Sequence, residues 1–482
     1  MAGIFLLKEH VADKHTAEMN KPLLSFWNAL LAKSGLLAYM PIIIVVILMF
    51  CGASWQIFWP STDAARYQCY ALTFWLGSSA VHLLPHSQCY FINASVIQGP
   101  FHMLPLEYPP LTLVIFSLSL LVALPYYQLL FALWMALTAV LIYWLLLRFG
   151  PRGSALIFAL YALVGAWATA EGRFDLVPAA LTLLCILAAE RKHWTAAYVA
   201  LAFGTLLKIY PLLLLPVLFI AEQRAAQRMD VPLQSMPAVP GELWRTLKGI
   251  LRWQWKNALL FFGILIAVTG LFALLDFQGA VVSQLNYFAQ RPVQIESTGS
   301  SILWLGSRFG YPAYVEFTYG SLNVASALGN KVAFGFEIAF ILGYLYTIWQ
   351  QWRGKMDIVQ AFIALLLVFI MTGKVFSPQY LIWVMPLLAY VSSLDMLWLI
   401  WWGSISLLTT IIYPYLYTRT TNVLLVQDVP GFIQAVAIRD ALFLLLTLAY
   451  LFNWFAIRRR KPVPPPLTGK ETKPLDAVVV IE

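Results

Sequence analysis

Long apolar stretches, separated by short polar segments, occupy most of this chain. Continuous runs of Leu, Ile, Val, Phe, Ala and Trp predict helices that cross a membrane or lie buried within it. The predicted apolar segments are 36-58, 111-147, 154-169, 176-189, 194-207, 210-222, 257-275, 331-350, 357-372, 380-394, 396-415 and 437-457. We therefore expect an all-α polytopic membrane protein with about 12 transmembrane helices.

The segment 111-147 departs from this pattern because it is too long for one ordinary span. Pro125 divides it, and a proline interrupts the hydrogen-bond ladder of a helix. Two full crossings would invert every later loop, so we expect one net crossing, with part of 111-124 partially inserted or buried against other helices. Other segments, such as 176-189, are shorter than a bilayer and indicate an interior cavity near the outer leaflet.

The composition excludes an ordinary soluble protein. Of the 482 residues, 61% are hydrophobic and 11% are charged. The net charge of +9 would indicate nucleic-acid binding in a soluble protein. Here Lys and Arg lie mostly in short loops beside apolar segments, where they set topology and meet anionic lipid headgroups. We therefore expect membrane lipids and no nucleic acid as partners. The N-terminus lacks a signal cleavage pattern, so we expect 36-58 to be a retained anchor.

The distribution of Lys and Arg predicts the topology, because loops rich in these residues stay in the cytoplasm. Basic side chains cluster at 148-152, 190-192, 222-256, 353-355 and 458-461. The segments expected to face outward are 59-110, 171-175, the surroundings of Lys208, 276-330, 373-379 and 416-436. Both termini are then cytoplasmic. The predicted organisation is an N-terminal segment 1-35, a transmembrane domain 36-457 with external loops 59-110 and 276-330 and a cytoplasmic loop 223-256, and a disordered tail 458-482.

Asp63 is the first ionisable residue after Lys33, at the far end of the first predicted span. Lysines precede the span, so the positive-inside rule delivers Asp63 to the outer face. A carboxylate at that height can take a proton from a substrate held at the membrane surface. A solvated loop acid is the ordinary alternative. Arg66 and Tyr67 follow Asp63 and suggest an interfacial helix.

Two further acidic positions face outward in this topology. Glu107 precedes Tyr108 and a pair of prolines, where an extended chain enters the next helix. The segment 171-175 places Glu171 and Asp175 around Arg173. A structural ion pair within that segment is the simplest interpretation of its charges, and a polar loop residue is the simplest interpretation of Glu107.

Basic residues on the outer side suggest a different role. Lys208 ends an apolar run, Arg291 precedes Pro292, and Lys374 leads into 376-380. For any one of them, snorkelling to lipid headgroups is the default interpretation. If these cations converge near short helices, they form a pocket that holds a phosphate.

Histidine and cysteine add little chemistry. His82, His86 and His102 share the first outer loop but lack the close spacing of a metal cluster, so we interpret them as interfacial or substrate-contacting and expect no zinc. Cys69 and Cys89 share that loop as well. A disulfide between them is one alternative, and free thiols are the expectation. No convincing Gly-rich phosphate-binding motif indicates a nucleotide-sugar donor.

The outward segments carry an ordered set of short motifs. After Asp63 come Tyr-Pro-Pro-Leu at 108-111, Gly-Arg-Phe-Asp at 172-175, Leu-Lys-Ile-Tyr-Pro at 207-211, Gln-Ile-Glu-Ser-Thr at 294-298 and Phe-Ser-Pro-Gln-Tyr at 376-380. In their order, spacing and outward placement, these motifs resemble the C-type membrane glycosyltransferases. The resemblance is strongest to glycosyltransferase family 87, which includes polyprenol-phosphate-mannose-dependent mannosyltransferases. It covers most of the chain, although no histidine follows His193, so a late-loop histidine of some relatives has no counterpart.

The resemblance implies a general base at Asp63 and a polyprenyl-phosphate sugar donor, used on the extracytoplasmic side of the cell membrane. Mannose is the expected sugar, with arabinose, galactose and glucose as alternatives, and the acceptor is a lipid or a glycan. The candidate donor-phosphate ligands are Lys208, Arg291, Lys374 and Arg173. The candidate substrate-binding residues are Glu107, Tyr108, Asp175, Gln294, Glu296, Gln379 and Tyr380. We expect inversion at the sugar carbon, with no metal and no cofactor.

A secondary transporter or a lipid flippase is the competing interpretation, in which the same charges bind and release cargo. A structural or assembly protein is another alternative. A transporter predicts internal symmetry and ionisable groups at the bilayer midplane, whereas the charges singled out above gather on one side. The sequence therefore favours an enzyme that acts on one face of the membrane.

Overall fold

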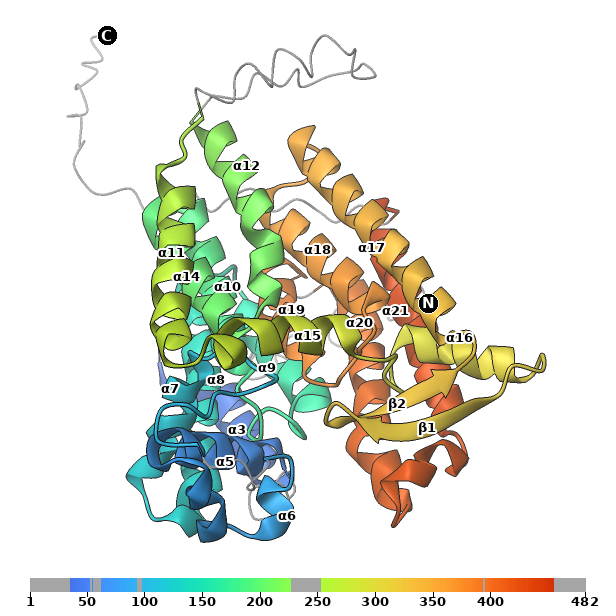
Figure 1. Cartoon of the computed structure of the whole chain (residues 1–482). Coiled ribbons are helices and arrows are strands. Elements are labelled where there is room, and N and C mark those ends of the chain that lie inside the picture. The colour runs from blue at the N-terminus through green and yellow to red at the C-terminus, as the bar shows by residue number, and fades with distance from the viewer. Residues whose placement is uncertain are drawn as a thin grey trace, which may run out of the picture.

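A computed structural model describes residues 35-52, 54, 62-92, 98-226, 253-392 and 395-454, except for the side chain of Phe288. The chain folds into a mostly helical bundle (Figure 1). The predicted tail 458-482, nearly all of 1-35 and most of the loop 223-256 lie outside the described residues.

The helices of the first half correspond to the predicted apolar segments, with the addition of two helices, α5 and α6, in the predicted first outer loop 59-110. They are α3 (Met40–Gly52), α5 (Asp63–Leu76), α6 (His86–Cys89), α7 (Thr112–Ser117), α8 (Tyr127–Phe149), α9 (Ser154–Gly165), α10 (Leu176–Glu190), α11 (Trp194–Leu207) and α12 (Leu215–Ala225). Short 3-10 turns cover Leu36–Tyr39, Ser78–Leu83, Leu118–Leu121, Leu124–Tyr126 and Tyr210–Leu214.

The long segment 111-147 divides into a short helix, α7, and one long helix, α8. The chain is extended at Val122, just before the 3-10 turn that contains Pro125, so the break lies where the sequence predicts it. The predicted single crossing is compatible with this arrangement. At the far end of α8, the Arg191 guanidinium lies 4.7 Å from the centre of the Phe149 ring, so the basic segments 148-152 and 190-192 lie at the same end of the bundle.

The second half adds α14 (Lys256–Leu275), α15 (Ser283–Gln290), α16 (Thr298–Ser307), α17 (Gly329–Trp352), α18 (Ile358–Thr372), α19 (Tyr380–Ser392), α20 (Met396–Thr410) and α21 (Phe432–Leu451). Wide turns of π type cover Gln278–Val282 and Ile411–Leu416, and 3-10 turns cover Tyr417–Arg419 and Val423–Asp428.

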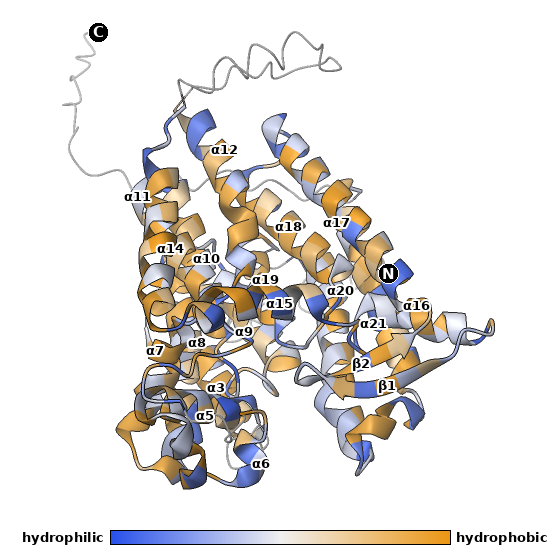
Figure 2. Cartoon of the chain, in the orientation of Figure 1, coloured by the Kyte–Doolittle hydropathy of each residue, from blue (hydrophilic) through white to orange (hydrophobic). Residues whose placement is uncertain are grey.

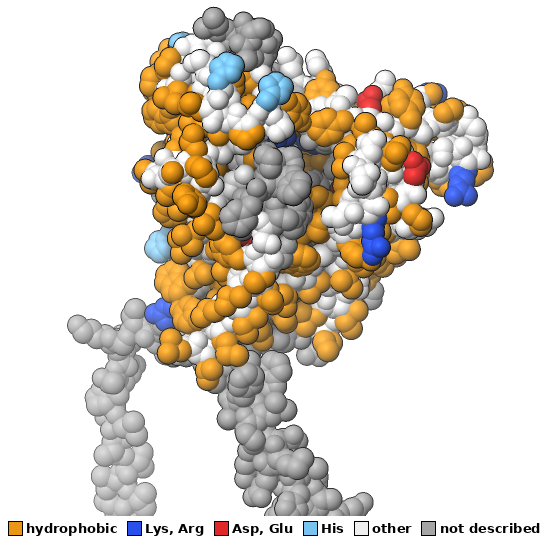
Figure 3. Space-filling model, turned by 90° about the horizontal axis from the view of Figure 1, so that it is seen from below, with side chains coloured by type: hydrophobic (Ala, Val, Ile, Leu, Met, Phe, Trp, Pro, Cys, Tyr) orange, Lys and Arg blue, Asp and Glu red, His pale blue; other side chains and the backbone are white. Residues whose placement is uncertain are grey.

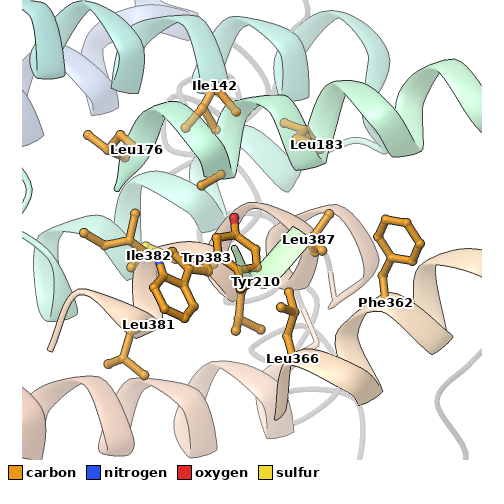
Figure 4. Close-up of a cluster of buried hydrophobic side chains, with 14 of the residues drawn as sticks. Ile142, Leu176, Leu183, Tyr210, Phe362, Leu366, Leu381, Ile382, Trp383 and Leu387 are labelled. Carbon is orange, nitrogen blue, oxygen red and sulfur yellow. The ribbon is translucent and has the colours of Figure 1, made fainter. Parts of the chain in front are cut away.

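The core lies between α8, α10, α18 and α19. Figure 4 shows Ile142, Leu183, Phe362 and Leu387 meeting there, with Tyr210 beside Trp383.

The all-α prediction is incomplete, because the predicted loop 276-330 contains a hairpin. Strand β1 (Ala313–Thr318) pairs antiparallel with β2 (Ser321–Ser326), and Tyr319 and Gly320 form the two-residue turn between them. Both turn residues have positive φ, 51° and 67°, as a hairpin turn of type I′ requires. The segment 293-295 lies beside β2, where Ile295 N–H donates to the Leu322 carbonyl at 3.0 Å.

Within the described part of the chain, five helical segments are long and apolar enough to cross a membrane: Leu124–Phe149, Lys256–Leu275, Gly329–Trp352, Met396–Arg419 and Phe432–Leu451. Shorter apolar helices fill the space between them, as expected for segments such as 176-189. Figure 2 shows apolar residues along most of the helices, with polar residues at the ends of α12 and α17 and in α15. The fold is therefore mostly helical and compatible with a helical membrane protein, while the number of crossings and the side of each terminus stay predictions.

The expectation of free thiols in the first outer loop is wrong. Cys69 of α5 and Cys89 of α6 form a disulfide, and Cys51 and Cys185 are the free cysteines of the described residues. Gln88 reinforces the same contact, because its Nε2 donates to the Ala65 carbonyl at 2.8 Å. Spacing in the sequence could not reveal this pairing, because it depends on the reversal of the chain between the two helices. The consequence is that α6 fixes the helix that carries Asp63.

Candidate active site in a polar cavity

A cavity of about 400 Å³ opens between the hairpin, α15, the start of α5 and the segment 373-380. Charged and aromatic side chains from distant parts of the sequence line it. The predicted site residues that line the cavity are Asp63, Glu107, Tyr108, Arg173, Lys208, Arg291, Gln294, Glu296, Gln379 and Tyr380. Figure 3 views the end of the molecule that carries α5, α6 and the hairpin, where hydrophobic side chains predominate and charged side chains are sparse.

Asp63 is the first residue of α5, and local sequence determines this position. Thr62 caps the helix, since its hydroxyl accepts a hydrogen bond from Ala65 N–H at 3.2 Å. The Asp63 carboxylate then meets Arg173, with 2.7 Å between Oδ2 and Nε. Its Oδ1 lies 3.9 Å from Arg66, and 23% of the side chain is exposed. Asp63 is therefore held by a guanidinium but is still accessible.

Arg66, which sequence reasoning did not assign to the site, lies one turn further along α5. Its Nη2 pairs with Glu107 Oε1, and Tyr70 donates a hydrogen bond to the same oxygen at 3.3 Å. Burial raises the pKa of Glu107, while Arg66 opposes this shift. Glu107 is thus an ion-paired wall of the cavity rather than a solvated loop residue.

The ion pair predicted within 171-175 does not form. Arg173 reaches Asp63, and its Nη1 also donates to Ser377 Oγ at 3.2 Å and to Gln379. Asp175 instead pairs with Lys208, with 2.6 Å between Oδ1 and Nζ. The segment therefore joins two elements that lie far from it in sequence.

Asp175 lies behind Lys208 rather than in the cavity wall, and the side chain of Asp175 is 1% exposed. Trp383 donates its indole N–H to Asp175 Oδ1 at 2.6 Å. The ammonium of Lys208 lies 4.9 Å from the centre of the Phe174 ring and 5.3 Å from the Trp383 ring. Burial lowers the pKa of Lys208, and Asp175 opposes this shift.

Gln294 joins the segments 293-298 and 373-380. Its backbone N–H donates to the Lys374 carbonyl at 2.8 Å, and its side-chain oxygen accepts from Phe376 N–H at 2.9 Å. The motifs at 294-298 and 376-380 thus form one wall of the cavity. Tyr380 stacks on Trp383 with ring centres 3.9 Å apart, which gives that wall an apolar platform of the kind that sugar faces contact.

The structure places two of the predicted phosphate ligands, Lys374 and Arg291, in different surroundings. Lys374 does not line the cavity, because its ammonium pairs with Glu337 at 3.0 Å. Arg291 does line it, and its guanidinium donates to Ser321 Oγ at 3.1 Å. Among the described residues, Arg291 is the cavity-lining cation with no carboxylate at salt-bridge distance, since Arg66, Arg173 and Lys208 all have one.

Sequence reasoning also missed a buried charge cluster behind Glu296. Arg439 and Asp440 lie within α21, in the apolar segment 437-457, and pair at 2.8 Å. Arg439 Nη1 lies 3.5 Å from Glu296 Oε2, and Tyr417 donates its hydroxyl proton to Glu296 Oε1 at 2.9 Å. Burial raises the pKa of Glu296, against the effect of Arg439. Adjacent opposite charges inside an apolar segment are the signal that indicates such a cluster.

The remaining predicted polar residues lie away from the cavity. His82, His86 and His102 are not among its lining residues, and His102 Nδ1 lies 2.9 Å from the Leu275 carbonyl. Glu171 is 1% exposed, and neither carboxyl oxygen has a hydrogen-bond partner among the described residues. The described part of the chain contains no group of three His, Cys, Asp or Glu side chains that could hold a metal ion.

No known protein-family model matches this chain, and no curated protein sequence matches it at a significant level. The candidate site therefore depends on its own geometry.

Proposed function

We propose that this protein is an integral membrane glycosyltransferase that moves a sugar, expected to be mannose, from a polyprenyl-phosphate donor to a lipid or glycan acceptor. The observation that carries this proposal is the convergence of ten predicted site residues, from six separate stretches of the sequence, around one cavity. The resemblance alone links these residues in sequence. Their contacts with one another give independent support.

Asp63 is the general base of the proposed reaction. The acceptor oxygen attacks the anomeric carbon, its proton passes to Asp63, and the bond between that carbon and the phosphate oxygen breaks. The electron pair leaves with the lipid phosphate. Arg173 holds Asp63 at 2.7 Å and thereby orients the carboxylate. A single displacement of this kind inverts the sugar carbon and needs no second carboxylate as nucleophile.

Arg291 is the strongest candidate for the ligand of the leaving phosphate. In a single displacement, the attacking oxygen and the leaving group lie on opposite faces of the sugar carbon. Cations that hold the base are therefore poorly placed to hold the phosphate as well. Arg291 has no carboxylate partner among the described residues, so an incoming phosphate neutralises it without displacing an existing ion pair. Lys208 and Arg173 then act mainly by positioning Asp175 and Asp63.

The disulfide between Cys69 and Cys89 supports an extracytoplasmic position for the cavity. Disulfides persist in oxidising compartments and are rare in the cytoplasm. This disulfide lies on α5, the helix that begins with Asp63. The predicted orientation, with the basic segments inside, leads to the same side.

One observation favours the transporter alternative. Arg439 and Asp440 lie inside a candidate membrane span, as ionisable groups of transporters do. However, their contacts are with each other and with Glu296 in the cavity wall, which is also what an enzyme needs to position a substrate ligand.

The deciding experiment is incubation of purified protein with a panel of polyprenyl-phosphate sugars and lipid extracts, followed by mass spectrometry. A transferase forms a product heavier than the acceptor by one sugar residue and releases the polyprenyl phosphate. Movement of a labelled cargo across proteoliposomes without any new glycosidic bond would instead identify a transporter.

A further inference from the structure

Tyr417 and Glu296 form a corner of the cavity that offers hydrogen-bond acceptors to a ligand. Tyr417 has one hydroxyl proton, and it donates this proton to Glu296 Oε1 at 2.9 Å. Its phenolic oxygen can therefore only accept a hydrogen bond from a ligand. With Arg439 beside it, the Glu296 carboxylate offers acceptors as well, and both residues line the cavity.

The groups behind this corner fix its geometry and its charge. Arg439 is fully buried and is shared by Glu296 and Asp440, so two carboxylates face one guanidinium. The guanidinium also lies 4.0 Å from the centre of the Phe376 ring. Ser301 donates to Asp440 Oδ2 at 2.8 Å, which fixes the second acid. The cluster therefore disfavours an anion and favours a neutral hydrogen-bond donor.

We propose that Tyr417 and Glu296 bind a hydroxyl group of a bound sugar, and that Arg439 and Asp440 are positioning residues for this subsite. The inference depends on the proposed glycosyltransferase function, because it names the chemistry by which that site selects its sugar. Glu296 and Tyr417 line the same cavity as Asp63. A hydroxyl bound at this corner therefore belongs to a substrate held in the cavity that contains the proposed base.

The hydroxyl belongs either to the transferred sugar or to the acceptor, and deoxygenated substrates distinguish these sources. Binding of polyprenyl-phosphate mannose and of its singly deoxygenated analogues is measured for the wild type and for Tyr417→Phe, Glu296→Gln and Arg439→Lys. For the wild type, we expect one analogue to bind at least about tenfold more weakly than the intact donor. The hydroxyl that this analogue lacks would otherwise pair with the buried acceptors of the subsite. In the variants this ratio falls toward one, since they already lack an acceptor or its correct placement.

Glu222→Gln is the matched control. Glu222 is also buried and also accepts a tyrosine hydroxyl proton, from Tyr198 at 2.8 Å, but it does not line the cavity. A purely structural role for Arg439 would lower thermal stability in Arg439→Lys and leave the ratio between donors unchanged. If Arg439→Lys does not fold, the double variant Arg439→Met with Asp440→Asn, which removes this ion pair together and keeps Glu296, takes its place.

The outcomes separate this inference from the proposed function. If wild-type protein forms product while all folded variants keep the wild-type preference among donors and acceptors, the subsite assignment is wrong and the transferase proposal stands. The preference for the intact substrate can also be absent among donors and present among acceptors, as measured by product formation with deoxygenated acceptors. In that case the subsite binds a hydroxyl of the acceptor, and the subsite assignment holds. If wild-type protein neither binds nor transfers any polyprenyl-phosphate sugar, both proposals fail.

Discussion

Asp63 is accessible to the cavity although a guanidinium holds one of its carboxylate oxygens. Replacement by Asn keeps the shape of the side chain but removes the proton acceptor. We expect product formation to fall by about 100-fold or more. Donor binding should persist, because Arg291, the proposed ligand of the phosphate, lines the cavity and does not pair with Asp63. Steady-state product formation and donor binding are measured side by side. Near wild-type turnover would refute the assignment and make Glu107, which lines the same cavity, the next candidate base.

Glu171 is a buried acid whose carboxyl oxygens have no hydrogen-bond partner among the described residues. It should make the stability of the fold depend on pH. Burial raises its pKa from 4.5 to about 8. The folded state therefore binds the proton more tightly than the unfolded state. Between pH 4.5 and pH 8 the free energy of unfolding should fall as pH rises, by about 1.4 kcal/mol per pH unit from this group.

Glu171→Gln should remove that dependence. We expect the variant to be more stable than the wild type at pH 7.5 and nearly equal to it at pH 4.5, as measured by thermal unfolding in detergent. Asp428→Asn, at an exposed acid, is the control and should change neither value. Equal stability of the wild type and Glu171→Gln at pH 7.5 would show that the carboxyl has a partner in solution.

At the scale of elements, the turn of the hairpin approaches the site at Gly320, which lies next to the guanidinium of Arg66. A Cβ atom at Gly320 would lie 2.9 Å from Arg66 Nη1, and the residue has φ of 67°. Gly320→Ala should therefore push the guanidinium away from Glu107 and reduce product formation by about tenfold or more. Gly310→Ala is a matched control, because Gly310 also has positive φ but has no neighbour within 4 Å. Similar activity of the two variants would mean that the hairpin does not position Arg66.

Hydropathy predicts the helices well because a helix inside a membrane must be apolar along most of its length, as in α8, α14 and α18. It does not predict the hairpin. Val315, Phe317, Leu322 and Val324 alternate with polar or exposed residues around Tyr319-Gly320, a strand pattern that is short and lies inside a predicted loop. The partners of the charges could not be predicted at all. Asp63 and Arg173 are separated by several helices, so their contact depends on packing.

At the scale of the whole molecule, the described parts of the two predicted sets of loops lie at opposite ends of the bundle. Glu190, Lys192, Arg224 and Asp357 line a common surface pocket at the end opposite the hairpin (Figure 1). The polar cavity lies toward the other end, beside α5 and the hairpin. Apolar helices connect the two. This polarity is what the positive-inside rule requires of a protein whose basic end stays in the cytoplasm.

The orientation can be tested by cysteine labelling in intact cells. With Cys51 and Cys185 replaced by Ser and the disulfide retained, single cysteines are introduced at two exposed positions, Thr421 and Lys192. A membrane-impermeant maleimide should label Thr421→Cys in intact cells and Lys192→Cys only after the membrane is opened, because the positive-inside rule predicts a cytoplasmic position for the basic end. Labelling of both positions after lysis is the control for accessibility. The reverse pattern in intact cells would place the cavity in the cytoplasm, where the Cys69–Cys89 disulfide would not be expected to persist, and would exclude an extracytoplasmic donor.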